Sequence, residues 1–129
     1  MARARDGTQM QLVLIDREHP DSSIVGQCTL SGITRGVFQA AHLGYGLDHR
    51  FVGRGLMGEA LRTVIDYAFY QMNLHRIMAN TMPSNERSLR LLERLGFERE
   101  GYARNYLYLA GAWRDHVLMA LTNTNWTQE

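Results

Sequence analysis

The sequence predicts an α/β domain whose mixed sheet contains one parallel strand-helix-strand crossover. Two observations lead to this prediction. Short apolar or alternating segments of strand length occur before and after the middle of the chain, and between them apolar residues change to helical spacing. A strand, a helix and a strand in direct succession require a right-handed crossover between parallel neighbours. We therefore expect three strands, a helix, a strand, a second helix and two final strands.

Three strand candidates come first. Residues 1 to 9 are polar, and we expect them to be flexible. MQLVLID (10–16) ends in the turn-rich REHPDSS, and IVGQCTLSGI (24–33) completes a hairpin with it. AAHLGYGLD (40–48) is the third strand, and its two glycines leave the backbone open to close approach.

The helical segment begins at Leu56 and extends to Met72. Its apolar residues fall on one stripe, while Glu59 and Arg62 lie opposite and are expected to face water. HRIMANTM (75–82) then has the character of a strand. Together with the third strand, this segment forms the predicted parallel crossover.

The second helix is bounded by clear signals at both ends. Pro83 ends the preceding strand, and Ser84 or Asn85 can cap the helix. Gly96 followed by Phe97 predicts a left-handed stop with a hydrophobic contact. Two alternating strands follow, at 102–110 and 113–122.

Composition restricts the function classes. The 129 residues fit a single domain, and the net charge of +1 arises from interspersed acidic and basic residues, which disfavours direct nucleic-acid binding. All 14 cationic side chains are Arg, so a Walker A lysine and a Schiff-base lysine are excluded. Cys28 is the one cysteine and no apolar run of membrane-spanning length occurs, so we expect a soluble, cytoplasmic protein without a metal site.

The segment HRFVGRGLMGEAL (49–61) offers two phosphate-binding motifs. Gly53-x-Gly55-x-x-Gly58 has dinucleotide-binding spacing, but two strands precede this one and the following strand has no carboxylate for a ribose. The same segment also contains Arg50-x-x-Gly53-x-Gly55. Glycines let successive N–H groups converge on a phosphate at a helix N-terminus. A glycine-rich helix entry without a ligand remains the alternative.

The Arg50-x-x-Gly53-x-Gly55 motif resembles the acyl-CoA pyrophosphate loop of the GCN5-related N-acetyltransferases (GNAT). A second family signature resembles residues 85–97, Asn-x-x-Ser-x-x-Leu-Leu-x-x-Leu-Gly-Phe. From about Ile24 to Trp126 the chain is similar to the Rim-type ribosomal-protein-alanine N-acetyltransferases. This resemblance implies a GNAT-type mixed sheet and acetyl-CoA as cosubstrate. It also implies a protein α-amino group as acceptor, typically the N-terminal alanine of a ribosomal protein.

The resemblance assigns cofactor contacts residue by residue. N–H groups from Val52 to Met57 would hold the pyrophosphate, and backbone groups from Tyr45 to Leu47 would pair with the pantetheine. Asn85 resembles the family's cofactor-contacting asparagine, and it can also cap the helix. The predicted cofactor-binding residues are Tyr45, Gly46, Leu47, Arg50, Val52, Gly53, Arg54, Gly55, Leu56, Met57, Asn85 and Ser88.

The catalytic groups depart from the family pattern. Many relatives carry a tyrosine where this chain has Leu92. The Rim-type enzymes resemble this sequence in having a serine three residues after the asparagine, and this resemblance makes Ser88 the candidate proton donor, although a first-turn hydroxyl can instead satisfy a helix N–H. No base can be carried over, because Asn80 occupies the position where some relatives have glutamate. Asp115 and His116 are the candidate bases, and on an alternating strand only one of them can face the site.

The family's first strand and two helices have no counterpart in this sequence, so we expect an N-terminally shortened domain. A natural short form, a start placed too late and a fragment all remain open. We expect apolar surface to be uncovered on the sheet and on the first helix, and hence a homodimer or higher oligomer. Two other functions remain open: acetylation of a small amine such as a polyamine or an antibiotic, and a non-catalytic acyl-CoA-binding module. A polyamine acceptor would require a carboxylate-rich groove, and the sequence shows no such cluster.

Overall fold

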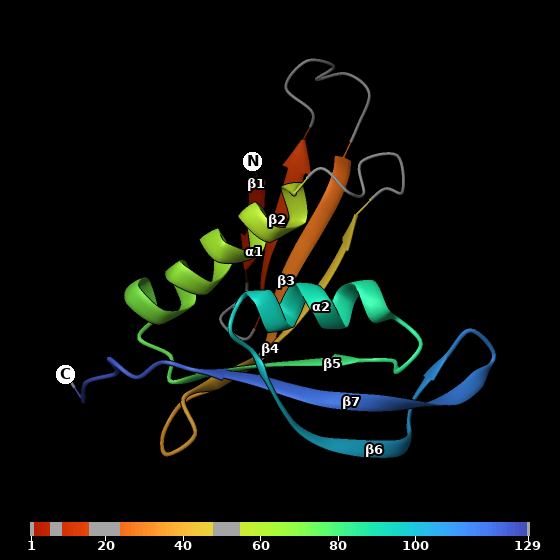
Figure 1. Ribbon diagram of the computed structural model, residues 1–129. Helices are drawn as coiled ribbons and strands as arrows, with labels where there is room; N and C mark the ends of the chain where they lie inside the picture. The colour runs from red at the N-terminus through yellow and green to blue at the C-terminus, as the bar shows by residue number, and fades with distance from the viewer. Residues whose placement is uncertain (1, 6–8, 16–23, 48–54, 129) are drawn as a thin grey trace.

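The computed structural model describes residues 2–5, 9–15, 24–47 and 55–128, which form one mixed sheet with two helical segments on it (Figure 1). The sheet has seven strands in the order β1-β2-β3-β4-β5-β7-β6. The elements are β1 Ala2–Arg5, β2 Met10–Ile15, β3 Ile24–Thr34, β4 Ala40–Leu47, α1 Leu56–Asp66, η2 Tyr67–Gln71, β5 Arg76–Thr81, α2 Glu86–Arg94, β6 Glu98–Leu109 and β7 Ala112–Thr122.

The predicted strands are all present, and one strand was not predicted. β1 pairs antiparallel with β2, from Ala2 opposite Val13 to Arg5 opposite Met10. The expectation that residues 1 to 9 are flexible is therefore wrong for Ala2–Arg5. An edge strand is held by main-chain hydrogen bonds to its neighbour, which do not require an apolar sequence.

The parallel crossover is confirmed between β4 and β5. Their pairing runs from Ala40 opposite Arg76 to His42 opposite Met78. β4 continues to Leu47 on its pairing with β3, whereas β5 continues to Thr81 on its pairing with β7. The two strands therefore separate after His42, and the separation opens the middle of the sheet.

The apolar stripe of the first helix is buried as predicted. Leu61 and Val64 are 0% and 1% exposed, and the stripe continues through Ala68 and Phe69. The last five residues, Tyr67–Gln71, form a π-helix, η2, rather than a continuation of the α-helix. The stripe itself packs into the main core, and Tyr70 of η2 is the exposed aromatic residue on this segment, at 65%.

The second helix begins and ends at the predicted signals. Asn85, rather than Ser84, is the N-cap, and its Oδ1 accepts the Ser88 N–H at 3.2 Å. At the other end Gly96 has a φ of 100°. The Phe97 N–H reaches the Leu92 carbonyl and the Gly96 N–H reaches the Glu93 carbonyl, which is a Schellman stop.

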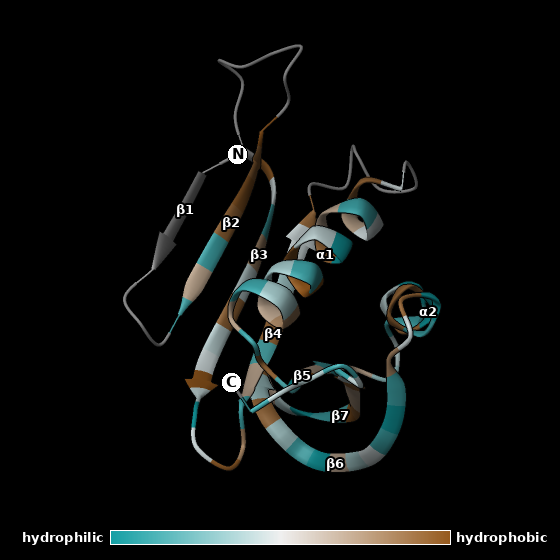
Figure 2. Ribbon diagram, turned by 90° about the vertical axis from the view of Figure 1, so that its left-hand side faces the viewer, coloured by the Kyte–Doolittle hydropathy of each residue, from teal (hydrophilic) through white to brown (hydrophobic). Residues whose placement is uncertain are grey.

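Both helices pack on the same face of the sheet (Figure 2). Cys28 and Tyr45 are opposite partners on β3 and β4, so their side chains share a face. Cys28 Sγ lies 3.7 Å from Met57 Sδ of α1, and the Tyr45 hydroxyl contacts Ser88 of α2. The other face of β4 is open and bears exposed residues such as His42.

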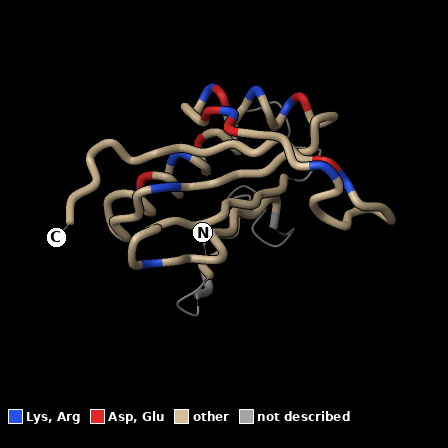
Figure 3. The backbone as a smooth tube through the Cα atoms, turned by 90° about the horizontal axis from the view of Figure 1, so that it is seen from below, with Lys and Arg blue, Asp and Glu red and all other residues tan. Residues whose placement is uncertain are grey.

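Exposed apolar surface is concentrated on the hairpin of β6 and β7. Tyr102, Tyr108 and Trp113 are each more than half exposed. Charged residues of both signs alternate along the helices instead of forming a run of one sign (Figure 3). On the sheet, the exposed apolar side chains therefore lie mainly on the β6–β7 hairpin.

Cys28 gives a direct test of the core. Its side chain is 1% exposed, and burial raises the pKa of the thiol from 9.0 to about 11. We expect iodoacetamide at pH 8 to label the folded protein far more slowly than the urea-unfolded chain, because the thiolate is the nucleophile. The raised pKa stabilises the fold below pH 9, and this contribution is lost as the pH rises through 11. Equal labelling rates for folded and unfolded protein would contradict the buried position.

Candidate functional site

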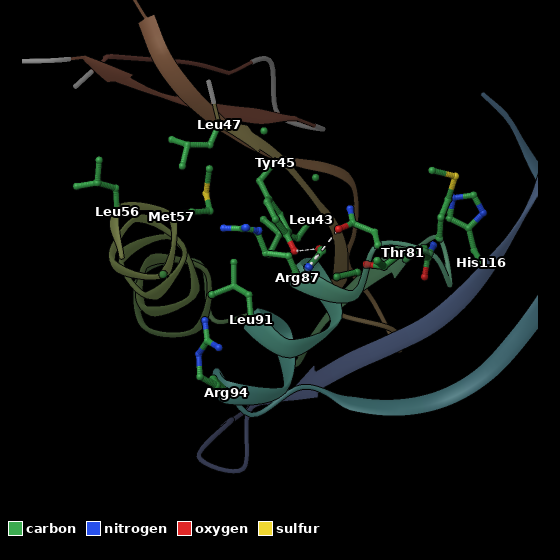
Figure 4. A pocket seen from close by; sticks show the side chains of 18 of the residues that line it. Leu43, Tyr45, Leu47, Leu56, Met57, Thr81, Arg87, Leu91, Arg94 and His116 are labelled. Carbon is green, nitrogen blue, oxygen red and sulfur yellow. Dashed lines mark hydrogen bonds between the residues drawn. The ribbon is translucent and has the colours of Figure 1, made fainter. Parts of the chain in front are cut away.

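A cavity of about 530 Å³ opens where β4 and β5 separate (Figure 4). Its walls are the end of β4, the end of β5, the first turn of α1 and one face of α2 from its start to Arg94. His116 of β7 and Leu109 of β6 also line it. The cavity is thus formed by six segments that the parallel crossover and the final hairpin bring together.

The β4 wall offers main-chain groups. After His42 the edge of β4 that faces β5 has no paired strand among the described residues, so its N–H and C=O groups need other partners. Tyr45, Gly46 and Leu47 line the cavity, as do Leu43 and Gly44. A Cβ atom at Gly44 or Gly46 would meet no other atom within 4 Å, which leaves this strand accessible to an extended ligand.

The α1 wall offers a helix N-terminus. Gly55 is the N-cap, with a φ of 74° that favours glycine, and Leu56 and Met57 follow it along the cavity. The first N–H groups of a helix have no intrahelical partner and attract anions. The predicted loop residues Arg50, Val52, Gly53 and Arg54 lie outside the described residues.

Two arginines on α2 add positive charge to the cavity, and sequence reasoning missed both. Arg87 and Arg94 lie seven positions apart, which places them on one face of the helix, and both line the cavity (Figure 4). Arg94 also lines a neighbouring hollow with Arg62 of α1. The seven-residue spacing was visible in the sequence, but only the packing of α2 beside α1 shows which way this face points.

The start of α2 carries Asn85 and Ser88, and both line the cavity. The Asn85 cap occupies the Ser88 main-chain N–H, so the Ser88 hydroxyl is not needed to cap the helix. That hydroxyl is instead hydrogen-bonded to the phenol of Tyr45. Burial raises the pKa of Tyr45, although the hydrogen bond with Ser88 opposes the shift, so the phenol is neutral at physiological pH.

His116 is a buried polar residue on the opposite side of the sheet from the helices. Its neighbour Val117 packs in the core opposite Thr81, so alternation turns His116 to the other face. Nδ1 lies 3.1 Å from the Arg114 carbonyl oxygen, which can only accept a hydrogen bond. Nδ1 therefore carries the proton in the neutral ring, and Nε2 has a free lone pair.

Asp115 does not line the cavity. Its carboxylate accepts the Asn105 N–H at 2.9 Å and the Tyr102 hydroxyl at 2.7 Å. The main-chain hydrogen bond is the larger cause, and both bonds hold the pKa of Asp115 below its ordinary value. Asn105 has a φ of 49° within an irregular part of β6, so Asp115 holds this irregularity in place.

The described residues contain neither a metal-binding group of side chains nor a membrane-spanning helix. Nowhere in the described ranges do three His, Cys, Asp or Glu side chains gather as a metal-binding group. In the same part of the chain, no helix is long and apolar enough to cross a membrane.

The fold and this site define the class of protein. A family model described as "Acetyltransferase (GNAT) domain" matches residues 1–98, and the separated parallel strands with a glycine-initiated helix beside them agree with that match. The chain belongs to the GNAT acetyltransferase family.

Individual relatives are more specific. The chain is 47% identical over 123 residues to the [ribosomal protein uS5]-alanine N-acetyltransferase of Escherichia coli, which covers 95% of this chain and 62% of the relative. A crystal structure of the ribosomal-protein-S5-alanine acetyltransferase from Vibrio fischeri matches with a TM-score of 0.89 and 42% identity, over 93% of this chain and 64% of that one. Mycobacterium smegmatis RimJ in complex with CoA-disulfide matches with a TM-score of 0.84 and 35% identity, over 95% of this chain and 57% of that one. The chain thus spans less than two thirds of the length of these relatives.

Proposed function

We propose that the protein is an acetyl-CoA-dependent N-acetyltransferase that acts on a protein α-amino group, the N-terminal alanine of a ribosomal protein. The observation that carries this proposal is a cavity through the separated sheet with a hydroxyl pair on one face and an imidazole lone pair on the other. Transfer from a thioester to an amine requires a group at the departing sulfur and a different group at the attacking nitrogen. The two faces of the cavity supply them.

The cofactor would lie along the first of these faces. The free edge of β4 at Tyr45, Gly46 and Leu47 fits the pantetheine amides, which need main-chain partners. The first N–H groups of α1 at Leu56 and Met57, with the Arg87 and Arg94 guanidinium groups, fit the phosphates. We propose that Arg50, Val52, Gly53, Arg54 and Gly55 complete the phosphate site and that Asn85 contributes to it.

The chain's own groups would then handle the protons. His116 Nε2 accepts the proton from the acceptor amine, whose pKa is near 8, so that a neutral nitrogen attacks the acetyl carbon. Ser88 faces the departing sulfur from the other side. Asp115 is committed to Asn105 and Tyr102, so we assign it a structural role in place of the proposed base.

The lining of the cavity argues against a polyamine acceptor. None of its described residues is Asp or Glu, and a cationic polyamine would require such groups. A peptide N-terminus presents one amine followed by uncharged main chain, which suits the mixed polar and apolar lining. We further propose that the protein acts in the cytoplasm, and that the exposed Tyr102, Tyr108 and Trp113 support self-association.

Acetyl-CoA turnover with a panel of amines tests the function. We expect release of CoA with peptides whose N-terminal residue is alanine, and much less with the same peptides after N-terminal blocking or with spermidine. Mass spectrometry should place the added acetyl group on the α-nitrogen. Binding of CoA without turnover of any acceptor would contradict the proposed activity and would support a non-catalytic acyl-CoA-binding module.

A further inference from the structure

The proposed chemistry leaves one feature of the cavity unused, the phenol of Tyr45. Its hydroxyl contacts Ser88 Oγ across 43 residues of sequence, and both residues line the cavity. Tyr45 reaches this point because it shares the helix-facing side of β4 with Leu43, and because α2 begins directly above it. Asn85 caps the Ser88 main-chain N–H, so the Ser88 hydroxyl is not needed for that purpose.

The direction of this hydrogen bond follows from the chemistry of its partners. A phenol is a far stronger acid than an alkyl hydroxyl, so Tyr45 is the better donor and Ser88 Oγ the better acceptor. When Ser88 Oγ accepts from Tyr45, the proton of Ser88 is directed to a third atom. The cavity offers such an atom when a ligand is bound, because Ser88 lines it.

We propose that Tyr45 is a positioning residue that, through Ser88, supplies a hydrogen bond to the sulfur of coenzyme A. This inference rests on the proposed function. Leu92 stands where many relatives have a tyrosine, and Tyr45 supplies a phenol from a different element, β4. Two hydrogen bonds in series, from Tyr45 to Ser88 and from Ser88 to sulfur, stabilise negative charge on the sulfur.

Acetyl transfer from the thioester to the amine does not require the Tyr45 phenol to lose its proton. The amine nitrogen forms a bond to the acetyl carbon, the carbon–sulfur bond breaks, and its electron pair remains on the sulfur. His116 passes the first proton of the ammonium group to water before the attack, and then takes the second proton, which the nitrogen loses as the amide forms. The thiolate is held by the Ser88 hydroxyl and takes a proton from water as it leaves, so the Tyr45 phenol keeps its own proton. Burial raises the pKa of that phenol, which agrees with a neutral donor.

Comparing CoA with desulfo-CoA, in which hydrogen replaces the thiol group, tests the contact separately from turnover. We expect the unaltered protein to bind CoA about threefold to tenfold more tightly than desulfo-CoA, as one net hydrogen bond allows. Tyr45→Phe keeps the ring and removes the hydroxyl. This variant and Ser88→Ala should each bring the ratio close to one, and the double variant should bring no further change.

The same variants should lower the kcat of acetyl transfer by roughly threefold to tenfold while the Kd of desulfo-CoA stays constant. Tyr70→Phe is the matched control, since it removes an exposed phenolic hydroxyl on η2, outside the cavity. A Tyr45→Phe protein with an unchanged CoA preference and kcat would overturn the inference, as would the absence of any preference in the unaltered protein. If the preference collapses in Tyr45→Phe but no acceptor is acetylated, the proposed function fails and the Tyr45–Ser88 pair stands.

Discussion

Gly55→Val should weaken CoA binding by roughly tenfold to a hundredfold, because one or two charge-assisted hydrogen bonds to phosphate are lost. Gly55 has a φ of 74°, and its open Cα faces the cavity at the start of α1. A branched side chain there projects into the space that the phosphates need. It also shifts the backbone of the first helical N–H groups away from a common point.

The difficulty with this variant is backbone strain, because a non-glycine residue at positive φ costs about 1–2 kcal/mol wherever it lies. Gly36→Val is the matched control. Gly36 has a φ of 72°, an added Cβ atom would meet nothing within 4 Å, and it lies in the turn between β3 and β4, away from the cavity. Both variants should lose similar stability in urea unfolding, and only Gly55→Val should lose CoA affinity in calorimetry. Unaltered affinity in Gly55→Val would remove α1 from the phosphate site.

Local patterns explain how much of the fold was predictable. The strand before α1, the buried stripe from Met57 to Phe69 and the stop at Gly96 each depend on neighbours within one helical turn or strand. β1 was not predictable in this way, because it is held by main-chain pairing with β2, and Ala and Arg side chains do not signal this.

The site shows the same division. The cap at Asn85 and the helix entry at Gly55 follow from local chemistry. The resemblance to a family suggested which ligand, acetyl-CoA, these residues would bind. The contact between Tyr45 and Ser88 depends on how α2 packs over β4, so no local pattern contains it. Strand alternation predicted that Asp115 or His116, but not both, would face the site. It could not choose between them, because the choice depends on the pairing of β7 with β5 and on the irregularity in β6.

The choice of His116 over Asp115 as the base leads to the second prediction of a large loss of activity. His116→Asn should lower the kcat/KM for a peptide acceptor by about a hundredfold at pH 7, which is the scale of a general base. The asparagine amide can still donate to the Arg114 carbonyl, as the ring Nδ1 does at 3.1 Å, but it has no basic nitrogen. The cavity and the binding of CoA should be preserved.

The pH dependence identifies the role. An α-amino group has a pKa near 8, so above that value the acceptor is already neutral and the missing base matters less. We therefore expect the deficit of His116→Asn to shrink as the pH rises from 7 to about 9. Asp115→Asn is the comparison, because it retains an oxygen for the Asn105 N–H and lies outside the cavity lining. It should lose stability and retain turnover within about threefold, since a displaced surface hydrogen bond acts on the fold more than on the reaction. A reversal of the two variants, with turnover lost in Asp115→Asn and retained in His116→Asn, would move the base to Asp115 and require a rearranged β6–β7 hairpin.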